Sequence, residues 1–202
     1  MTENSPGAVY AVLLAAGASR RFGGENKLLA RIDGMPLVRL AAVELIKSRV
    51  AGVIAVTGFE ADQVREALQG LDIQFAVNHE YADGLASSLR CGVAALPDDA
   101  AGVMIALADM PGMASDYLNQ LIAIFEVERC GKIVYLERED GSQGNPVIWP
   151  ARYFAELQKL EGDTGARKLI QQYSEYTRPL RVDVSDVLDD IDTPRDLKDW
   201  QG

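Results

Sequence analysis

The chain has 202 residues, of which 48% are hydrophobic and 25% are charged, and its formal net charge is −10. This length predicts one domain, and the composition excludes a disordered or low-complexity chain. A surface with this negative charge repels nucleic acids and anionic lipids. We therefore expect neither a nucleic-acid partner nor a membrane partner.

Apolar runs alternate along the chain with stretches of helical periodicity. Strands are predicted at 10–16, 53–57, 73–77, 103–108, 133–136, 147–149 and 180–184. Helices are predicted at 35–48, 61–68, 85–96, 118–127, 154–160, 166–173 and 194–200. Strands that are apolar throughout and alternate with helices are typical of a mostly parallel sheet covered on both faces. We therefore predict a single three-layer α/β domain over 1–202, with a flexible tail at 1–8 and ligands beyond the carboxyl ends of the strands.

Several classes of site and location are excluded by simple counts. Cys91 and Cys130 stand far apart and His79 is the only histidine, which excludes a zinc site built from cysteine and histidine. No G-x-S-x-G accompanies His79, so we interpret it as a loop or packing residue rather than a catalytic base. The sequence shows neither a signal peptide nor an apolar stretch of roughly 18 residues, and we expect a soluble, cytoplasmic protein.

Glycines and cations gather in the loop after the first predicted strand. Residues 14–27 have the sequence LAAGASRRFGGENK, which contains neither a G-x-G-x-x-G fingerprint nor a Walker loop. Glycines let backbone N–H groups approach a ligand, and Arg20, Arg21 and Lys27 place three cations at the functional edge of an acidic protein. This combination suits a triphosphate. A surface loop with merely solvated cations remains the alternative.

Carboxylates follow the predicted strand 103–108 and precede the last helix. Asp109 ends that strand, where its side chain can hold a hard cation such as Mg²⁺, the alternative being a turn aspartate. Asp190 and Asp192 share a face if their segment is extended, and Thr193 and Pro194 can begin the helix that follows. The nearby Asp186 and Asp189 are interpreted as surface charges.

Three further segments lie where loops should meet the sheet edge. Asn78 follows the strand at 73–77, and residues 84–88 (GLASS) open a helix whose free N–H groups favour an anion, unless the helix is simply capped. Residues 144–147 (GNPV) and 162–167 (GDTGAR) are interpreted as turns that enter the next element. Cys91, Trp149 and Trp200 are interpreted as packing residues.

Taken together, these motifs resemble the nucleotidyltransferases similar to the molybdenum cofactor guanylyl- and cytidylyltransferases. The family signature L-A-A-G-x-S-x-R-x-G-x-x-x-K corresponds to residues 14–27, its aspartate-x-proline to 109–111, and its D-x-D-T-P-x-D to 190–196. The resemblance extends from Val9 to Trp200, and the combination of the first loop and D-x-D-T-P with the G-N-P-V and G-D-x-G-A-R segments is more specific to the cytidylyltransferase branch. It implies a Rossmann-like three-layer α/β nucleotidyltransferase fold.

The same resemblance implies the roles of individual residues. Lys27 and Arg21 are expected to be catalytic, and Asp109 and Asp192 to hold Mg²⁺ (or Mn²⁺), with Asp190 ranked lower. The expected nucleotide-binding residues are Leu14, Ala15, Ala16, Gly17, Ser19, Arg21, Lys27, Asn78, Gly84, Ser87, Ser88 and Asp109. The expected acceptor-binding residues are Gly144, Asn145, Pro146, Asp163 and Arg167, with Asn145 standing where many relatives carry histidine.

The implied reaction is transfer of CMP from CTP to the phosphate of molybdopterin, with release of pyrophosphate. Guanylyltransferase relatives carry glycine where this chain has Ala16, and the extra methyl group favours the smaller base of CTP. A molybdenum hydroxylase is the expected recipient of the product. The alternatives are a transferase of the same fold that uses GTP or another acceptor phosphate, and a non-enzymatic carrier of the molybdenum cofactor. The presence of Lys27, Asp109 and Asp192 argues against the carrier.

Overall fold

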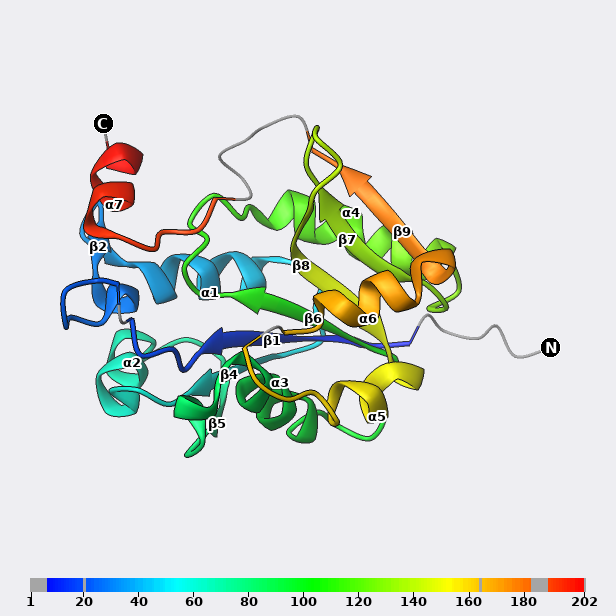
Figure 1. Ribbon diagram of the computed structural model, residues 1–202, viewed down its shortest axis with the longest axis horizontal. Helices are drawn as coiled ribbons and strands as arrows, with labels where there is room; N and C mark the ends of the chain where they lie inside the picture. Colours follow the sequence, from blue (N-terminus) through cyan, green and yellow to red (C-terminus); the bar gives the residue numbers. More distant parts are fainter. Residues whose placement is uncertain (1–6, 20, 164, 183–188, 202) are drawn as a thin grey trace.

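A seven-stranded sheet forms the centre of the computed structural model, which describes residues 7–19, 21–163, 165–182 and 189–201 (Figure 1). The strand order is β5-β4-β1-β6-β8-β7-β9. Neighbouring strands are parallel except β8, which runs antiparallel to both β6 and β7. The strands are β1 (Val9–Ala15), β4 (Val53–Thr57), β5 (Gln74–Val77), β6 (Gly102–Leu107), β7 (Ile133–Glu137), β8 (Gln143–Pro150) and β9 (Thr177–Arg181). A separate two-stranded ribbon pairs β2 (Arg31–Ile32) with β3 (Met35–Pro36).

Helices cover both faces of this sheet. The helices are α1 (Leu37–Lys47), α2 (Ala61–Ala67), α3 (Leu85–Ala94), α4 (Ser115–Val127), α5 (Phe154–Leu157), α6 (Arg167–Gln172) and α7 (Pro194–Gln201). Short 3₁₀ turns add η1 (Lys27–Leu29), η2 (Tyr81–Asp83), η3 (Ala151–Tyr153) and η4 (Ser174–Tyr176). The core packs α1, α2 and α4 against one face and α3, α5 and α6 against the other.

Strand β1 shows why the buried strands are apolar along their whole length. Ala11 and Leu13 belong to the core beneath α1 and α4, whereas Val12 and Leu14 belong to the core beneath α3. Because successive side chains point to opposite faces, a strand covered on both sides needs apolar residues at every position. The prediction of a three-layer α/β fold with a mostly parallel sheet is thereby confirmed.

A third, smaller core holds the C-terminal segment against the first loop. Phe22, Leu37 and Ile191 are buried there, and Leu197 and Trp200 of α7 pack against them. Trp149, which was also expected to be a packing residue, is fully buried in the core beneath α3. This small core holds the C-terminal segment against the loop after β1, at the carboxyl edge of the sheet.

Several elements differ from their predicted bounds; α4, for example, begins at Ser115 rather than at residue 118. The helix predicted at 35–48 begins only at Leu37, because residues 35–36 pair with β2 around a turn at Asp33 and Gly34. Residues 144–146, predicted as a turn, lie within β8, where the register against β7 shifts and the strand bulges. The helix predicted at 154–160 ends at Leu157. The last strand begins at Thr177 rather than residue 180.

Some predictions fall partly or wholly on residues outside those described. They concern residues 183–184 of the last strand, Asp186, Arg20, Thr164 and residues 1–6 of the N-terminal tail. Within the described part, the Ala8 carbonyl already accepts a hydrogen bond from the Ala101 N–H at 2.9 Å. Asp189 is a surface charge as expected, 59% exposed and 3.4 Å from Arg138. Among the described residues, no helix is both long and apolar enough to cross a membrane.

Candidate active site

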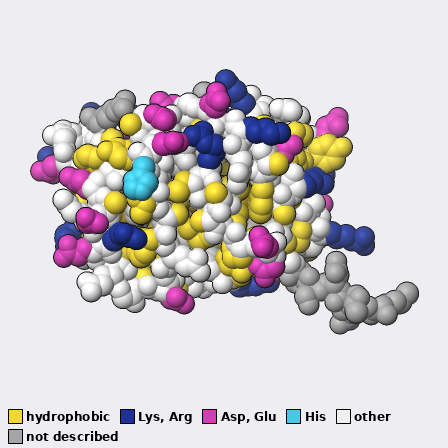
Figure 2. Space-filling model, turned by 90° about the horizontal axis from the view of Figure 1, so that it is seen from below, with side chains coloured by type: hydrophobic (Ala, Val, Ile, Leu, Met, Phe, Trp, Pro, Cys, Tyr) yellow, Lys and Arg dark blue, Asp and Glu magenta, His cyan; other side chains and the backbone are white. Residues whose placement is uncertain are grey.

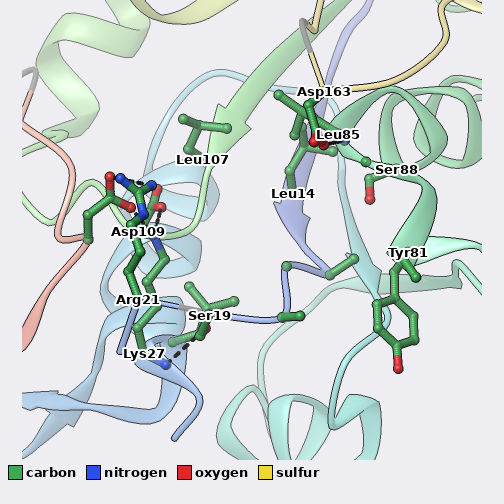
Figure 3. A pocket seen from close by; sticks show the side chains of 17 residues that line it. Leu14, Ser19, Arg21, Lys27, Tyr81, Leu85, Ser88, Leu107, Asp109 and Asp163 are labelled. Carbon is green, nitrogen blue, oxygen red and sulfur yellow. Dashed lines mark hydrogen bonds and ion pairs between the residues drawn. The ribbon is translucent and has the colours of Figure 1, made fainter. Parts of the chain in front are cut away.

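A cavity of about 350 Å³ opens at the carboxyl ends of β1 and β6 (Figure 3). The first loop forms one wall, and the segment from Tyr81 to Ser88 forms the opposite wall. Asp109, Asp163 and Asp192 contribute carboxylates to the lining. The cavity therefore lies where the loops after parallel strands converge, which is the usual ligand position in open α/β sheets.

The first loop is folded by its own polar side chains. Ser19 adopts a left-handed backbone with φ 49°, and its carbonyl accepts the Phe22 N–H at 2.9 Å. The Ser19 hydroxyl oxygen accepts the backbone N–H of Lys27 at 3.1 Å. The buried Asn26 accepts the Leu28 N–H at 3.1 Å and so begins η1. These contacts close the loop and fix the backbone position of Lys27 at the start of that turn.

Two cations of this loop reach two of the predicted metal ligands. The Lys27 Nζ lies 2.5 Å from Asp109 Oδ2 and 2.8 Å from Asp192 Oδ1. Arg21 lies 2.7 Å from the other oxygen of Asp192, but its side chain is 71% exposed against 14% for Lys27. Burial alone lowers the pKa of the Lys27 ammonium, but the charges and hydrogen bonds of Asp109 and Asp192 outweigh burial and raise that pKa. Lys27 is thus held as a half-buried cation between two carboxylates.

The two acidic segments are joined through the backbone. The Ile191 N–H donates to the Asp109 carbonyl at 2.9 Å, which places the flanking aspartates beside the end of β6. Asp196 accepts the N–H groups of Asp192 and Thr193, while the Thr193 hydroxyl accepts the Asp196 N–H at 3.2 Å. This reciprocal pattern is a capping box that begins α7. The expected cap is therefore present, and it holds Asp192 in place.

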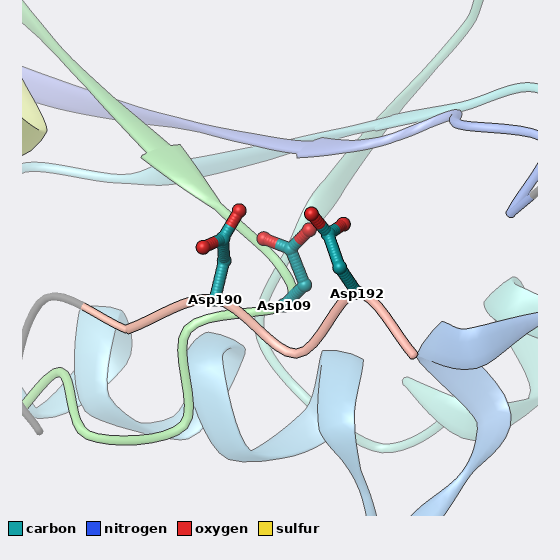
Figure 4. Close-up of side chains that lie close together, drawn as sticks. All are labelled: Asp109, Asp190 and Asp192. Carbon is teal, nitrogen blue, oxygen red and sulfur yellow. The ribbon is translucent and has the colours of Figure 1, made fainter. Parts of the chain in front are cut away.

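Three carboxylates cluster at this point (Figure 4). One oxygen from each of Asp109, Asp190 and Asp192 lies within 4.8 Å of the others. Burial, together with the charges of Asp192 and Asp109, raises the pKa of the Asp190 carboxyl, although Asp190 keeps an exposed surface. The second oxygen of Asp109 is buried and has no hydrogen-bond partner among the described residues. An all-oxygen donor set with one buried, unsatisfied oxygen fits a divalent cation such as Mg²⁺ or Mn²⁺. Asp190, ranked lower from the sequence, belongs to the cluster.

A second cavity, of about 420 Å³, adjoins the first and shares Leu14, Leu85 and Leu107 with it. Its wall contains Gly144 and Asn145 of the bulged strand β8. The remaining polar lining includes Arg138, Arg167 and Asp190. Asp190 lines the second cavity, whereas Asp109 and Asp192 line the first. The carboxylate cluster therefore stands at the junction of the two cavities.

The start of α3 corrects one prediction. Its N–H groups were expected to be free for an anion, yet Leu85 N–H donates to Asp163 Oδ1 at 3.3 Å and Ala86 N–H to the Gly162 carbonyl at 3.0 Å. Gly84 has φ 100°, and a Cβ atom on it would lie 2.3 Å from Asp163 Oδ1. Only glycine permits this close approach. Asp163 thus caps α3 and lines the first cavity rather than the second.

The predicted site residues divide between lining and supporting positions. Nine predicted nucleotide residues line the first cavity: Leu14, Ala16, Gly17, Ser19, Arg21, Lys27, Gly84, Ser88 and Asp109. Ala15 faces the opposite core because side chains alternate along β1. Asn78 and Ser87 are buried behind the wall, where Asn78 Nδ2 donates to Ser87 Oγ at 2.8 Å. Of the predicted acceptor residues, Gly144, Asn145 and Arg167 line the second cavity, whereas Pro146 lines neither.

Tyr81 and Arg138 are among the lining residues that sequence reasoning missed, whereas His79 lies outside both cavities. Tyr81 belongs to no motif, and its ring packs 6.3 Å from that of Phe59 beside the first cavity. Arg138 directly follows β7, so the rule that chemistry follows each strand could have found it. His79 is exposed on the surface (Figure 2) and belongs to neither cavity, as expected for a loop histidine.

Comparisons with known proteins point to one family. Residues 11–177 match the family model described as MobA-like NTP transferase domain. The chain is 29% identical to nicotine blue oxidoreductase of Paenarthrobacter nicotinovorans and 29% identical to purine catabolism protein PucB of Bacillus subtilis, each over 92% of both chains. A protein named probable molybdenum cofactor guanylyltransferase, from Haloferax mediterranei, is 29% identical over 54% of this chain and 51% of its own.

Solved structures agree with this relationship. The crystal structure of Rv0371c from Mycobacterium tuberculosis H37Rv superposes with a TM-score of 0.84 at 28% identity, covering 98% of this chain and 99% of that one. A complex of Rv0371c with manganese superposes with a TM-score of 0.77 at 27% identity, covering 95% and 97%. A relative of the same fold has thus been solved with a divalent cation.

Proposed function

The chain belongs to the MobA-like NTP transferase family, and from that premise we propose that it transfers CMP from CTP to the phosphate of molybdopterin and releases pyrophosphate. The single observation that carries the proposal is the placement of the carboxylate cluster between two adjoining cavities. A transferase of this kind needs one binding site for the triphosphate and one for the acceptor. Charged groups are needed between the two sites, where the bond to phosphorus breaks and the new one forms.

The first cavity suits the nucleotide. Lys27 and Arg21 are the cations of its wall, and they stand at the end that contains Asp109 and Asp192. A triphosphate therefore binds with its phosphates at that end, where Lys27 exchanges its carboxylate partners for phosphate oxygens. Cations placed in this way balance the charge that develops on the departing pyrophosphate.

Ala16 supports CTP as the donor. Its side chain is 2% exposed and lines the first cavity. A Cβ atom placed on Gly58 would lie 2.9 Å from the Ala16 Cβ and 2.7 Å from the Tyr81 Cβ. The backbone at Gly58 therefore approaches Ala16 so closely that no side chain fits between them, and the Ala16 methyl group in the cavity wall favours a pyrimidine over the larger purine.

The second cavity suits the acceptor. Arg138 and Arg167 supply cations to its lining, and the bulge in β8 exposes Gly144 and Asn145 to the same space. Guanidinium groups bind phosphate through several directed N–H donors. A molybdopterin phosphate held there lies next to Asp190 and so next to the junction.

The reaction transfers the α-phosphoryl group of CTP, with its nucleoside, to the acceptor phosphate. An oxygen of the acceptor phosphate forms a bond to the α-phosphorus of CTP, and the bond from that phosphorus to the bridging oxygen of the β-phosphate breaks. The acceptor phosphate is already ionised near neutral pH, so no side-chain base is needed. Asp109, Asp190 and Asp192 would hold a divalent cation, which would supply positive charge to the phosphate oxygens. The protein contributes position and charge, which are the main requirements of phosphoryl chemistry.

Pyrophosphate release measured with each triphosphate in turn tests this function. The assay contains Mg²⁺ or Mn²⁺ and either molybdopterin or a simple sugar phosphate, with Asp109→Ala as the inactive control. Release that requires CTP and molybdopterin supports the proposal. Preference for GTP, which the relative from Haloferax mediterranei makes the second candidate, refutes the CTP assignment. Absence of pyrophosphate with every triphosphate refutes transfer and favours a carrier that delivers the molybdenum cofactor to a hydroxylase.

A further inference from the structure

Asn78 stands at the end of β5 and organises two serines of α3. Its side chain is buried, with 5% of the residue exposed. Its Oδ1 accepts the backbone N–H of Glu80 at 2.9 Å. Its Nδ2 donates to Ser87 Oγ at 2.8 Å and to Ser88 Oγ at 3.1 Å.

These contacts fix the direction of every hydrogen bond in the group. A backbone N–H can only donate, so the atom of Asn78 that faces Glu80 must be the amide oxygen, and the nitrogen must face the serines. Both serine oxygens therefore accept from Asn78, and each hydroxyl proton has to be donated elsewhere. Ser87 donates its proton to the Gly84 carbonyl at 2.8 Å.

Ser88 is left with a proton and no acceptor for it among the described residues. Unlike Ser87, it lines the first cavity. The Ser88 hydroxyl is thus set as a hydrogen-bond donor toward whatever fills that space. Asn78 fixes this direction, because its oxygen is held by the Glu80 N–H and its nitrogen donates to Ser88.

The position of Ser88 indicates which part of a nucleotide it meets. Figure 3 shows Ser88 and Tyr81 on one side of the cavity and Lys27 and Asp109 on the other. Under the proposed function, on which this step rests, the triphosphate lies at the Lys27 end. The base then lies toward Ser88, with the ring of Tyr81 beside it.

We propose that Ser88 determines base specificity as a fixed hydrogen-bond donor. Asn78 donates to the Ser88 oxygen and so makes the Ser88 hydroxyl a donor toward the cavity. The pairing edge of cytosine presents two adjacent acceptors, O2 and N3. The pairing edge of guanine presents N–H donors at the corresponding positions. A donor fixed at the position of O2 or N3 therefore satisfies cytosine and faces an N–H donor of guanine, whose acceptor O6 lies where cytosine has its amino group. A donor left unpaired in this way discriminates strongly between ligands.

Two substitutions test the donor. Ser88→Ala removes it and is expected to weaken CTP binding by about three- to tenfold. The same change should strengthen GTP binding, because the unpaired donor that faces guanine is gone. Asn78→Asp reverses the polarity, because a carboxylate accepts from both serines and turns the Ser88 lone pairs toward the cavity. This variant is expected to lower the ratio of CTP to GTP affinity by about tenfold or more.

Equilibrium binding provides the measurement, because it does not depend on turnover. Dissociation constants for CTP, GTP and inorganic tripolyphosphate are determined by calorimetry for the wild type and both variants. Tripolyphosphate has no base, so its affinity reports any general change of charge or fold. Ser87→Ala is the matched control, since it removes the other serine hydroxyl held by Asn78, and it is expected to preserve the CTP to GTP ratio.

An unchanged CTP to GTP ratio in Ser88→Ala overturns the proposal, even if Asn78→Asp fails to fold. A loss of CTP affinity that tripolyphosphate matches also overturns it. The proposed function fails separately: wild-type protein that binds CTP in preference to GTP but releases no pyrophosphate refutes the transfer reaction and leaves the role of Ser88 standing.

Discussion

Replacing Lys27 with methionine should tighten the binding of a divalent cation in the absence of nucleotide. The Lys27 ammonium contacts Asp109 and Asp192, two of the three residues whose oxygens form the candidate cation site. It therefore competes with a metal ion for the same oxygens. Methionine keeps much of the length of the side chain and removes the charge.

The size of the effect follows from two short contacts, at 2.5 and 2.8 Å, between side chains that are at most 22% exposed. A charge-assisted hydrogen bond contributes about 1.5–3 kcal/mol. Displaced Lys27 regains hydration and, when a nucleotide is present, phosphate contacts, so we take the net cost of displacement as about one such bond. Removing that cost corresponds to roughly ten- to a hundredfold tighter binding of Mn²⁺.

Titration with Mn²⁺, followed by the electron paramagnetic resonance of the free ion, measures this affinity directly. Lys47→Met is the matched control, because Lys47 contacts the single carboxylate of Glu44 and is 58% exposed. The same Lys27→Met protein should bind CTP about ten- to a hundredfold more weakly, since a phosphate contact is lost. Unchanged or weaker Mn²⁺ binding in Lys27→Met would refute competition between the ammonium and the metal.

Three further predictions concern other parts of the molecule. Asp109→Ala should abolish turnover while its circular dichroism stays that of the folded wild type, and near-normal activity would remove Asp109 from the cation site. Ala16→Gly should shift the ratio of kcat/KM values toward GTP, and an unchanged ratio would contradict the packing argument. Glu44 accepts the N–H of Ser115 at 2.8 Å and an N–H of Lys47 at 2.7 Å; burial raises the pKa of Glu44, but these bonds outweigh burial and lower it below its ordinary 4.5. Glu44→Gln should therefore lower the free energy of unfolding by about 1 kcal/mol near neutral pH. This loss of unfolding free energy should shrink as the pH falls below 4.5. Denaturant unfolding at several pH values measures it, and a loss of the same size at every pH would contradict the prediction.

The fold was predictable because its signals are local. Strands β1 and β6 are apolar along their length, and the motifs at residues 14–27 and 109–111 follow them, so the parallel topology brings these motifs to one edge. The convergence of Lys27, Asp109 and Asp192 could be predicted for this reason, together with the family resemblance.

The errors arose where a contact between distant segments decides the outcome. No pattern near Gly84 indicates that residues 162–163 cap the helix that begins at Leu85. Similarly, Asn78 was expected to contact the nucleotide. It is instead buried and donates to Ser87 and Ser88, so that it supports the residues of the cavity wall. Residues 144–146 carry turn-forming Gly, Asn and Pro, yet pairing with β7 draws them into a bulged strand.

The fate of each phosphate of CTP tests the central claim most directly. Two samples of CTP, one labelled at the α-phosphate and one at the γ-phosphate, are incubated with the protein, Mg²⁺ and molybdopterin. We predict that the α-label appears in the molybdopterin product and the γ-label in pyrophosphate, and that Asp109→Ala yields neither. Transfer of the γ-label to the acceptor, or retention of the α-label in unreacted CTP, would contradict nucleotidyl transfer at this site.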